Sequence, residues 1–143
     1  MKKCDGREIW QATEAEEQTA LFEWAAVQRG KYPEIDLLHH IPNGGYRAKH
    51  EAAKLKAMGV KAGVPDLFLP VARGECHGLY IELKRMADGR PSGEQIDWMT
   101  ALAAQGYQVA LCRGWDAAAR EIMRYLGMRE SYKARGGEEK AIT

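Results

Sequence analysis

Hydrophobic residues recur every three or four positions in four segments of the chain, which is the pattern of amphipathic helices. The first segment follows Thr13, which together with Glu16 has the sequence of a capping box, and it ends at Gly30. A second capping box, with Ser92 as the cap, opens the third segment. The predicted helices span 14–29, 48–58, the residues between Ser92 and Gly106, and a last helix that Asp116 caps and that reaches Leu126.

Between the helices the apolar residues take the spacing of strands. Residues 66–71, in which a short apolar run follows Asp66, are typical of a buried strand, and residues 79–84 alternate with period two. A turn region at 73–75 separates them and predicts an antiparallel hairpin. Two further strands are predicted, a short one within 36–42 and one over 107–112. The order helix, strand, helix, hairpin, helix, strand, helix predicts an α/β fold with a mixed sheet flanked by helices.

The composition limits the number of domains. A chain of 143 residues that is 45% hydrophobic and 29% charged suits one globular domain with a single core. The residues from Arg129 onward are polar and contain glycines, so we expect them to be mobile or ordered by a partner. The sequence thus predicts a folded domain over 1–128 and a polar C-terminal tail over 129–143.

Charge and cysteine content narrow the function classes. With 21 Lys and Arg residues against 20 Asp and Glu, the formal net charge is +1, so a polyanionic partner has to be held by a local basic patch. The cysteines, 3 in number, form no Cys-x-x-Cys pair, which argues against a disulfide scaffold. No apolar run approaches the roughly 20 residues of a membrane span, and acidic residues follow the N-terminus where a signal peptide has apolar ones. We therefore expect no membrane contact and a cytoplasmic location.

Histidines and cysteines raise the question of a zinc site. Their spacing, with His39 next to His40 and Cys76 next to His77, matches none of the usual zinc patterns. We expect these histidines to line a sheet edge or the substrate groove instead.

Three charged residues stand out on the predicted hairpin. Glu82 and Lys84 lie two positions apart on one strand and so point to the same face, and Asp66 begins the strand that pairs with it. Two carboxylates on neighbouring strands repel each other unless a cation lies between them, and oxygen ligands suit Mg²⁺. A lysine beside such a site stabilises the negative charge that develops when a phosphodiester is hydrolysed. The alternative is an ordinary solvated sheet face, on which an apolar-Glu-apolar-Lys pattern is common.

The segment between Arg47 and Lys61 has the most unequal charge in the chain. It holds five basic residues and one acidic residue, which predicts a surface that contacts phosphate groups; a solvated helix face is the alternative. The Asn43-Gly44-Gly45 turn before it offers backbone donors without bulky side chains, and Gly63 leaves room for the close approach of a ligand. The candidate substrate-binding residues are Asn43, Arg47, Lys49, Lys54, Lys61 and Gly63.

Several runs of residues, taken in order, resemble a known family. They are Ile41-Pro42-Asn43-Gly44-Gly45, the segment from Leu55 to Leu67 with Gly63-Val64-Pro65-Asp66, then Ile81-Glu82-Leu83-Lys84-Arg85, and Gln95 with Trp98. Together they are similar to the stand-alone virus-type replication-repair nuclease (VRR-NUC) domain of the PD-(D/E)xK nuclease superfamily, over about 14–126. The resemblance implies a restriction-endonuclease-like core in which Asp66 and Glu82 bind Mg²⁺ or Mn²⁺ and Lys84 is catalytic. It also implies supporting catalytic roles for Glu14 and Gln95.

The two supporting residues have simpler explanations. Glu14, Glu16 and Glu17 all lie in the first helical turn, where acids stabilise the helix dipole, and the capping box requires Glu16. Glu14 is preferred because it stands four residues before Gln18, which matches the Glu-x-x-x-Gln pattern of the family. Gln95 stands at the third helical position, where reaching back to the cap explains it without any role in catalysis.

The resemblance implies a more specific function than the residues alone do. Stand-alone members imply an endonuclease that hydrolyses phosphodiester bonds of branched DNA, such as four-way (Holliday) junctions, in a bacterial or phage-infected host cell. They also imply a symmetric homodimer, since resolving a junction requires two cuts. The alternative is a nucleic-acid-binding module that keeps the nuclease fold without cleavage.

Overall fold

The structure, a computed structural model, describes residues 2–4, 7–9, 11–42, 49–87, 89–128, 130–133 and 139–142. Its centre is a four-stranded sheet with the strand order β3-β4-β5-β6. β4 is antiparallel to both β3 and β5, whereas β6 runs parallel to β5. The predicted mixed sheet and its antiparallel hairpin are confirmed. The strands are β3 (His39–His40), β4 (Leu67–Leu69), β5 (Leu79–Lys84) and β6 (Gln108–Arg113).

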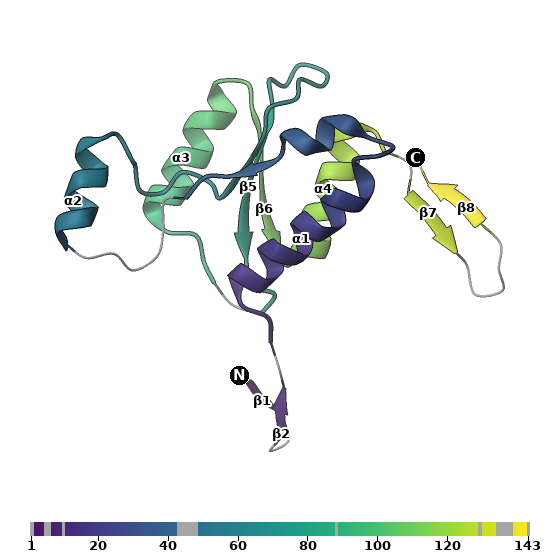
Figure 1. Cartoon of the computed structure of the whole chain (residues 1–143), viewed down its shortest axis with the longest axis horizontal. Coiled ribbons are helices and arrows are strands. Elements are labelled where there is room, and N and C mark those ends of the chain that lie inside the picture. The colour runs from purple at the N-terminus through teal and green to yellow at the C-terminus, as the bar shows by residue number, and fades with distance from the viewer. Residues whose placement is uncertain are drawn as a thin grey trace.

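Helices flank this sheet (Figure 1). α1 and α4 pack against each other and against β5, and α3 packs on β6. α2 lies apart from the sheet in Figure 1, and none of its residues, all of which the structure describes, is buried. In the described part of the chain, every helix is too short or too polar to cross a membrane. The helices are α1 (Glu14–Gln28), α2 (Lys49–Ala57), α3 (Gly93–Ala104) and α4 (Trp115–Leu126), with a 3-10 helix, η1 (Pro33–Leu37), after α1.

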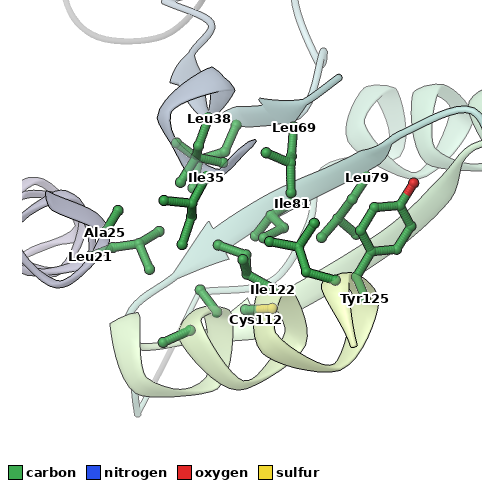
Figure 2. Packing of buried hydrophobic residues seen from close by; sticks show 14 of the residues in the cluster. Leu21, Ala25, Ile35, Leu38, Leu69, Leu79, Ile81, Cys112, Ile122 and Tyr125 are labelled. Atoms are coloured by element: carbon green, nitrogen blue, oxygen red, sulfur yellow. The ribbon is translucent and has the colours of Figure 1, made fainter. Parts of the chain in front are cut away.

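The hydrophobic core lies between the sheet and the pair of helices α1 and α4 (Figure 2). Ile81 of β5 packs there with Leu21 of α1 and Ile122 of α4, and each of these side chains is 0% exposed. Because side chains alternate along a strand, Glu82 and Lys84 of β5 point to the opposite face. The alternation predicted from the sequence therefore keeps the acid and the lysine out of the hydrophobic core.

The helix starts show which polar residues have a structural task. Both predicted capping boxes form, with caps at Thr13 and Ser92. The prediction that Asp116 caps α4 is wrong, because the helix begins one residue earlier, at Trp115. The carboxylate of Glu17, on α1, accepts the Trp115 N–H at 2.7 Å instead. An acid from another helix thus supplies the acceptor and the negative charge that a helix N-terminus favours.

One predicted strand is shorter in the structure, and two hairpins lie outside the central sheet. The strand expected within 36–42 is reduced to β3, because Pro33 starts a 3-10 helix that continues to Leu37 and buries Ile35. The predicted polar tail contains an antiparallel hairpin, and a second hairpin precedes α1; Figure 1 shows both away from the sheet. These strands are β1 (Lys2–Cys4), β2 (Arg7–Ile9), β7 (Glu130–Lys133) and β8 (Glu139–Ile142).

Candidate functional site

Asp66 and Glu82 come together where β4 pairs with β5. Leu67 is the register partner of Ile81, so Asp66, one residue before Leu67, stands at the level of Glu82, one residue after Ile81. The backbone N–H of Leu83 donates to Oδ2 of Asp66 at 2.9 Å. This bond ties the Asp66 carboxylate to the strand that carries Glu82, and the structure therefore brings the two acids together.

The carboxylate of Glu82 is buried, and only one of its two oxygens has a hydrogen-bond donor among the described residues. The residue is 1% exposed, and its Oε1 accepts a hydrogen bond from Nε2 of Gln95 at 2.8 Å and lies 3.5 Å from the Lys84 ammonium. Its Oε2 is also buried, and no described residue offers it a hydrogen-bond partner. Leaving such an oxygen unpaired costs about 1–3 kcal/mol. A cation bound at this atom would remove that cost.

The electrostatics of Asp66 and Glu82 also favour a bound cation. Burial, together with the neighbouring Asp66 carboxylate, raises the pKa of Glu82 to about 8, and the Lys84 ammonium offsets this only in part. Glu82 therefore takes up a proton more readily than an ordinary glutamate when no cation is bound. Two hard oxygen donors with a partnerless buried oxygen between the strands form a donor set that fits Mg²⁺ or Mn²⁺.

Lys84, at the end of β5, is 8% exposed, and a loop follows it. Gly89 of this loop lies against the lysine: a Cβ here would be 3.4 Å from Cδ of Lys84 and 3.9 Å from Oε1 of Glu14. The φ of Gly89 is +90°, a value that favours glycine, and its carbonyl accepts a hydrogen bond from Arg113 at 2.8 Å. Gly89 thus packs against the aliphatic part of the lysine side chain.

The structure separates the three acids at the start of α1. Glu16 is the acid of the capping box, and its carboxylate accepts the N–H of Thr13 at 2.7 Å. Glu17 is buried and accepts the N–H of Trp115. Glu14 faces a cavity of about 480 Å³ next to the strand ends. The cavity is lined by Glu14, Ala15, Gln18, Thr19, His40, Asp66 and Leu83.

Glu14 shares this cavity with Asp66 but does not complete a cluster of three acids. In the part of the chain that the structure describes, no group of three or more Asp, Glu, His or Cys side chains is arranged to hold a metal ion. The candidate ligands are therefore the pair Asp66 and Glu82, and Glu14 stands beyond them, near Lys84. Its role in catalysis stays a prediction.

Gln95 makes contacts that fit both explanations left open by the sequence, and its role in catalysis stays a prediction. Its Oε1 accepts the N–H of Ser92 at 2.8 Å, which completes the capping box of α3. Its Nε2 donates to Glu82 at the same time. The two contacts support each other, because the cap fixes the amide that orients the carboxylate.

The predicted DNA-contacting residues of the basic segment are described only in part. Asn43 and Arg47 lie outside the described residues. Lys49 and Lys54 are exposed on α2, and Lys61 is exposed after it. Since no residue of α2, which the structure describes in full, is buried, the lysines of this helix lie on a surface that does not pack against the hydrophobic core. Their contact with DNA stays a prediction.

Gly63 has a structural explanation. Its φ is +91°, and a Cβ at this position would lie 2.8 Å from the backbone of Glu94, at the start of α3. Only glycine allows the loop before Asp66 to pack so closely on α3. Contact of Gly63 with a substrate is not needed to explain the residue and stays a prediction.

The sequence predicts His40 at a sheet edge or in the substrate groove but without a role at the site, and the structure confirms its place on β3, the edge strand of the sheet. The residue lines the cavity, and its Nδ1 lies 2.9 Å from the main-chain oxygen of Asp66. A histidine in a two-residue strand has no chemical signature of its own. The available signal is its position directly before the Ile41-Pro42-Asn43 run.

Comparisons with known proteins agree with this fold. The model of the VRR-NUC domain family matches residues 12–116, which include the mixed sheet and the acid pair. A solved structure described as a VRR-NUC domain protein is similar to this chain with a TM-score of 0.72 and 36% sequence identity, covering 84% of this chain and 93% of the other. No curated protein matches the chain.

Proposed function

Because the chain belongs to the VRR-NUC domain family, we propose that it is a divalent-metal-dependent endonuclease that hydrolyses DNA phosphodiester bonds. The family and its restriction-endonuclease-like fold indicate a nuclease. The observation that carries the proposed reaction is the buried Oε2 of Glu82, which has no partner among the described residues and stands beside Asp66 and Lys84. Mg²⁺ or Mn²⁺ is the proposed cofactor.

In this proposal each residue of the site has its own task. Asp66 and Glu82 would hold the ion, which would neutralise their charge and supply an activated water molecule for phosphodiester hydrolysis. Gln95 keeps the Glu82 carboxylate in its orientation. Lys84 stabilises the negative charge that develops during the reaction, and its burial strengthens this effect. Glu14 borders the cavity that receives the substrate beside Asp66.

The basic surface of α2 is the proposed contact for the DNA backbone. Its lysines are exposed and suit a polyphosphate, whereas the chain as a whole has a net charge of only +1. We propose branched DNA such as four-way junctions as the substrate, and a homodimer as the acting form because a junction requires two cuts. Both proposals are supported by the resemblance to stand-alone VRR-NUC domains.

Cleavage by the purified protein tests the proposal. Labelled four-way junctions and linear duplexes of the same sequence are incubated with Mg²⁺ or Mn²⁺, using wild-type protein and Lys84→Ala. We expect metal-dependent cutting of junctions that is lost in Lys84→Ala, while DNA binding is retained. Binding without cutting by the wild-type protein would identify a non-catalytic nucleic-acid-binding module with a nuclease fold. Negligible cutting and binding of both DNAs would reject the proposal.

A further inference from the structure

The main-chain carbonyl of Asp66 accepts two hydrogen bonds from the neighbouring chain segment that contains β3. The N–H of Ile41 donates to it at 2.7 Å, and Nδ1 of His40 lies 2.9 Å from the same oxygen. A carbonyl oxygen only accepts, so Nδ1 carries the hydrogen and His40 is the donor. One backbone group and one side chain therefore hold the same oxygen.

The position of Asp66 in the chain explains why this support matters. The preceding Pro65 has no N–H to give to a strand ladder, and β4 begins only at Leu67. On the other side, the N–H of Leu83 holds Oδ2 of the carboxylate. Asp66 is thus held through its main chain from β3 and through its side chain from β5. These bonds fix the direction in which its carboxylate faces Glu82.

The adjacent His39 makes a similar bond in a different place. Its Nδ1 lies 3.0 Å from the carbonyl oxygen of Leu37, and its ring meets Phe68 edge to face with 5.8 Å between the ring centroids. Because successive residues of a strand point to opposite faces, His39 faces away from the cavity that His40 lines. The two histidines therefore make the same kind of hydrogen bond, His40 to Asp66 of the site and His39 to Leu37 outside it.

We propose that His40 is a positioning residue of the metal site, whose Nδ1–H holds the Asp66 main chain so that the carboxylate stays aligned with Glu82. This inference rests on the proposed function for the metal, and it concerns the hydrogen bond of the imidazole rather than its charge. Removing a group that hydrogen-bonds a metal-binding residue typically lowers metal affinity by about 10–100-fold. The His40 side chain is exposed, so its replacement acts on the site and not on the core.

Four variants test the proposal: His40→Ala, His40→Asn, His40→Gln and His39→Ala. Titration calorimetry measures Mn²⁺ affinity, and junction cleavage gives kcat and KM. We expect His40→Ala to weaken Mn²⁺ binding about tenfold or more and to lower kcat with an unchanged KM for DNA. In His40→Asn the amide nitrogen reaches the place of Nδ1 and restores both quantities. In His40→Gln the amide lies one carbon further out and gives no rescue, and His39→Ala behaves like the wild-type protein.

The outcomes separate this inference from the proposed function. Equal Mn²⁺ affinity in His40→Ala and His39→Ala overturns the inference, as does equal affinity in the Asn and Gln variants. The Asn and Gln comparison decides the matter even if His40→Ala does not fold. A wild-type protein that binds no Mn²⁺ overturns both proposals. Normal binding and cleavage by the wild-type protein, with no difference among the variants, overturns the inference alone.

Discussion

The side-chain amide of Gln95 donates to Oε1 of Glu82 at 2.8 Å, from the first turn of α3 to the sheet. The same side chain closes the capping box with Ser92. The start of the helix fixes the amide, and the amide fixes which oxygen of Glu82 has no partner among the described residues. Gln95 therefore caps helix α3 and also hydrogen-bonds a carboxylate of the candidate metal site.

Replacing the two halves of this capping box separates the two roles. Gln95→Ala removes part of the cap together with the donor to Glu82, whereas Ser92→Ala removes part of the cap alone. Each variant is expected to lower the free energy of unfolding by about 1 kcal/mol. Only Gln95→Ala is expected to slow cleavage, because only this variant releases the Glu82 carboxylate. Denaturant unfolding and junction cleavage measure the two effects, and an equal loss of cleavage in both variants would show that Gln95 acts only through the helix.

Metal binding is expected to strengthen as the pH rises. Since the pKa of Glu82 is raised to about 8, its carboxyl group holds a proton at neutral pH that the ion must displace. The Mn²⁺ affinity should therefore increase by up to about tenfold per pH unit between about pH 5 and pH 8 and level off above that range. Calorimetry at several pH values, in buffers with different ionisation enthalpies, measures both the affinity and the released proton.

The raised pKa of Glu82 also makes the metal-free protein less stable as the pH rises, whereas metal binding strengthens. Because folding raises the pKa of Glu82, the folded state binds more protons than the unfolded state between the usual pKa of a glutamate and about 8. The contribution of this group to stability is therefore lost as the pH rises through that range. Glu82→Gln, which is neutral at every pH, is expected to remove this dependence and to abolish metal binding. An unchanged pH dependence of stability in this variant would assign the proton to another group.

The fold and the acid pair follow from local features of the sequence. Capping residues and the change of period from helix to strand act within a few residues, and the hairpin that brings Asp66 next to Glu82 has its turn between them. The same alternation puts Lys84 on the face of Glu82. For this reason the pairing of these residues could be predicted without any knowledge of the tertiary structure.

The remaining site residues depend on contacts between distant segments. The acceptor for the N–H of Trp115 is Glu17, 98 positions earlier in the chain, so neither the buried acid nor the mistaken cap at Asp116 could be recognised locally. The bond from His40 to Asp66 also joins separate elements, 26 positions apart. Sequence patterns report which residues share a face of one element, and they do not report which elements meet.

The three acids in the first turn of α1 are expected to respond differently to replacement by alanine. Glu17→Ala leaves the N–H of Trp115 without its acceptor and should lower the free energy of unfolding by about 1–3 kcal/mol. Glu16→Ala removes half of a capping box and should cost about 0.5–1 kcal/mol. Glu14→Ala should leave stability within about 0.5 kcal/mol and reduce cleavage. If the loss of cleavage simply follows the loss of stability across the three variants, Glu14 has no role at the site.

Gly89→Ala tests whether the loop after β5 positions Lys84. The added methyl group would lie 3.4 Å from Cδ of the lysine, at a φ of +90° that alanine disfavours. Gly59→Ala is the matched control, because φ is +101° there and no described atom lies within 4 Å of the new methyl group. Both variants are expected to lose about 1–3 kcal/mol of stability from backbone strain. Cleavage assays should show a loss in Gly89→Ala alone, and equal activity of the two variants would contradict a positioning role for the loop.

The lysines of α2 are expected to control DNA affinity without affecting the fold. In the double variant Lys49→Ala/Lys54→Ala the free energy of unfolding should stay within about 0.5 kcal/mol, because both residues are exposed on a helix whose described residues are all unburied. Each lost phosphate contact reduces the slope of log K against log salt by about 1, so the double variant should show a slope lower by about 2. The value of kcat at saturating DNA should not change, since the acid pair and Lys84 remain.

Lys31→Ala is the control for this measurement. Lys31 is also exposed, on the turn after α1, and its replacement removes one positive charge in the same way. A general attraction between protein and DNA would depend on net charge and would weaken in proportion to the number of lysines removed, wherever they lie. Direct phosphate contacts depend on position, so the change in salt slope should be confined to the α2 variant. A slope change per lysine that is the same in Lys31→Ala would mean that α2 is not the surface that holds the DNA.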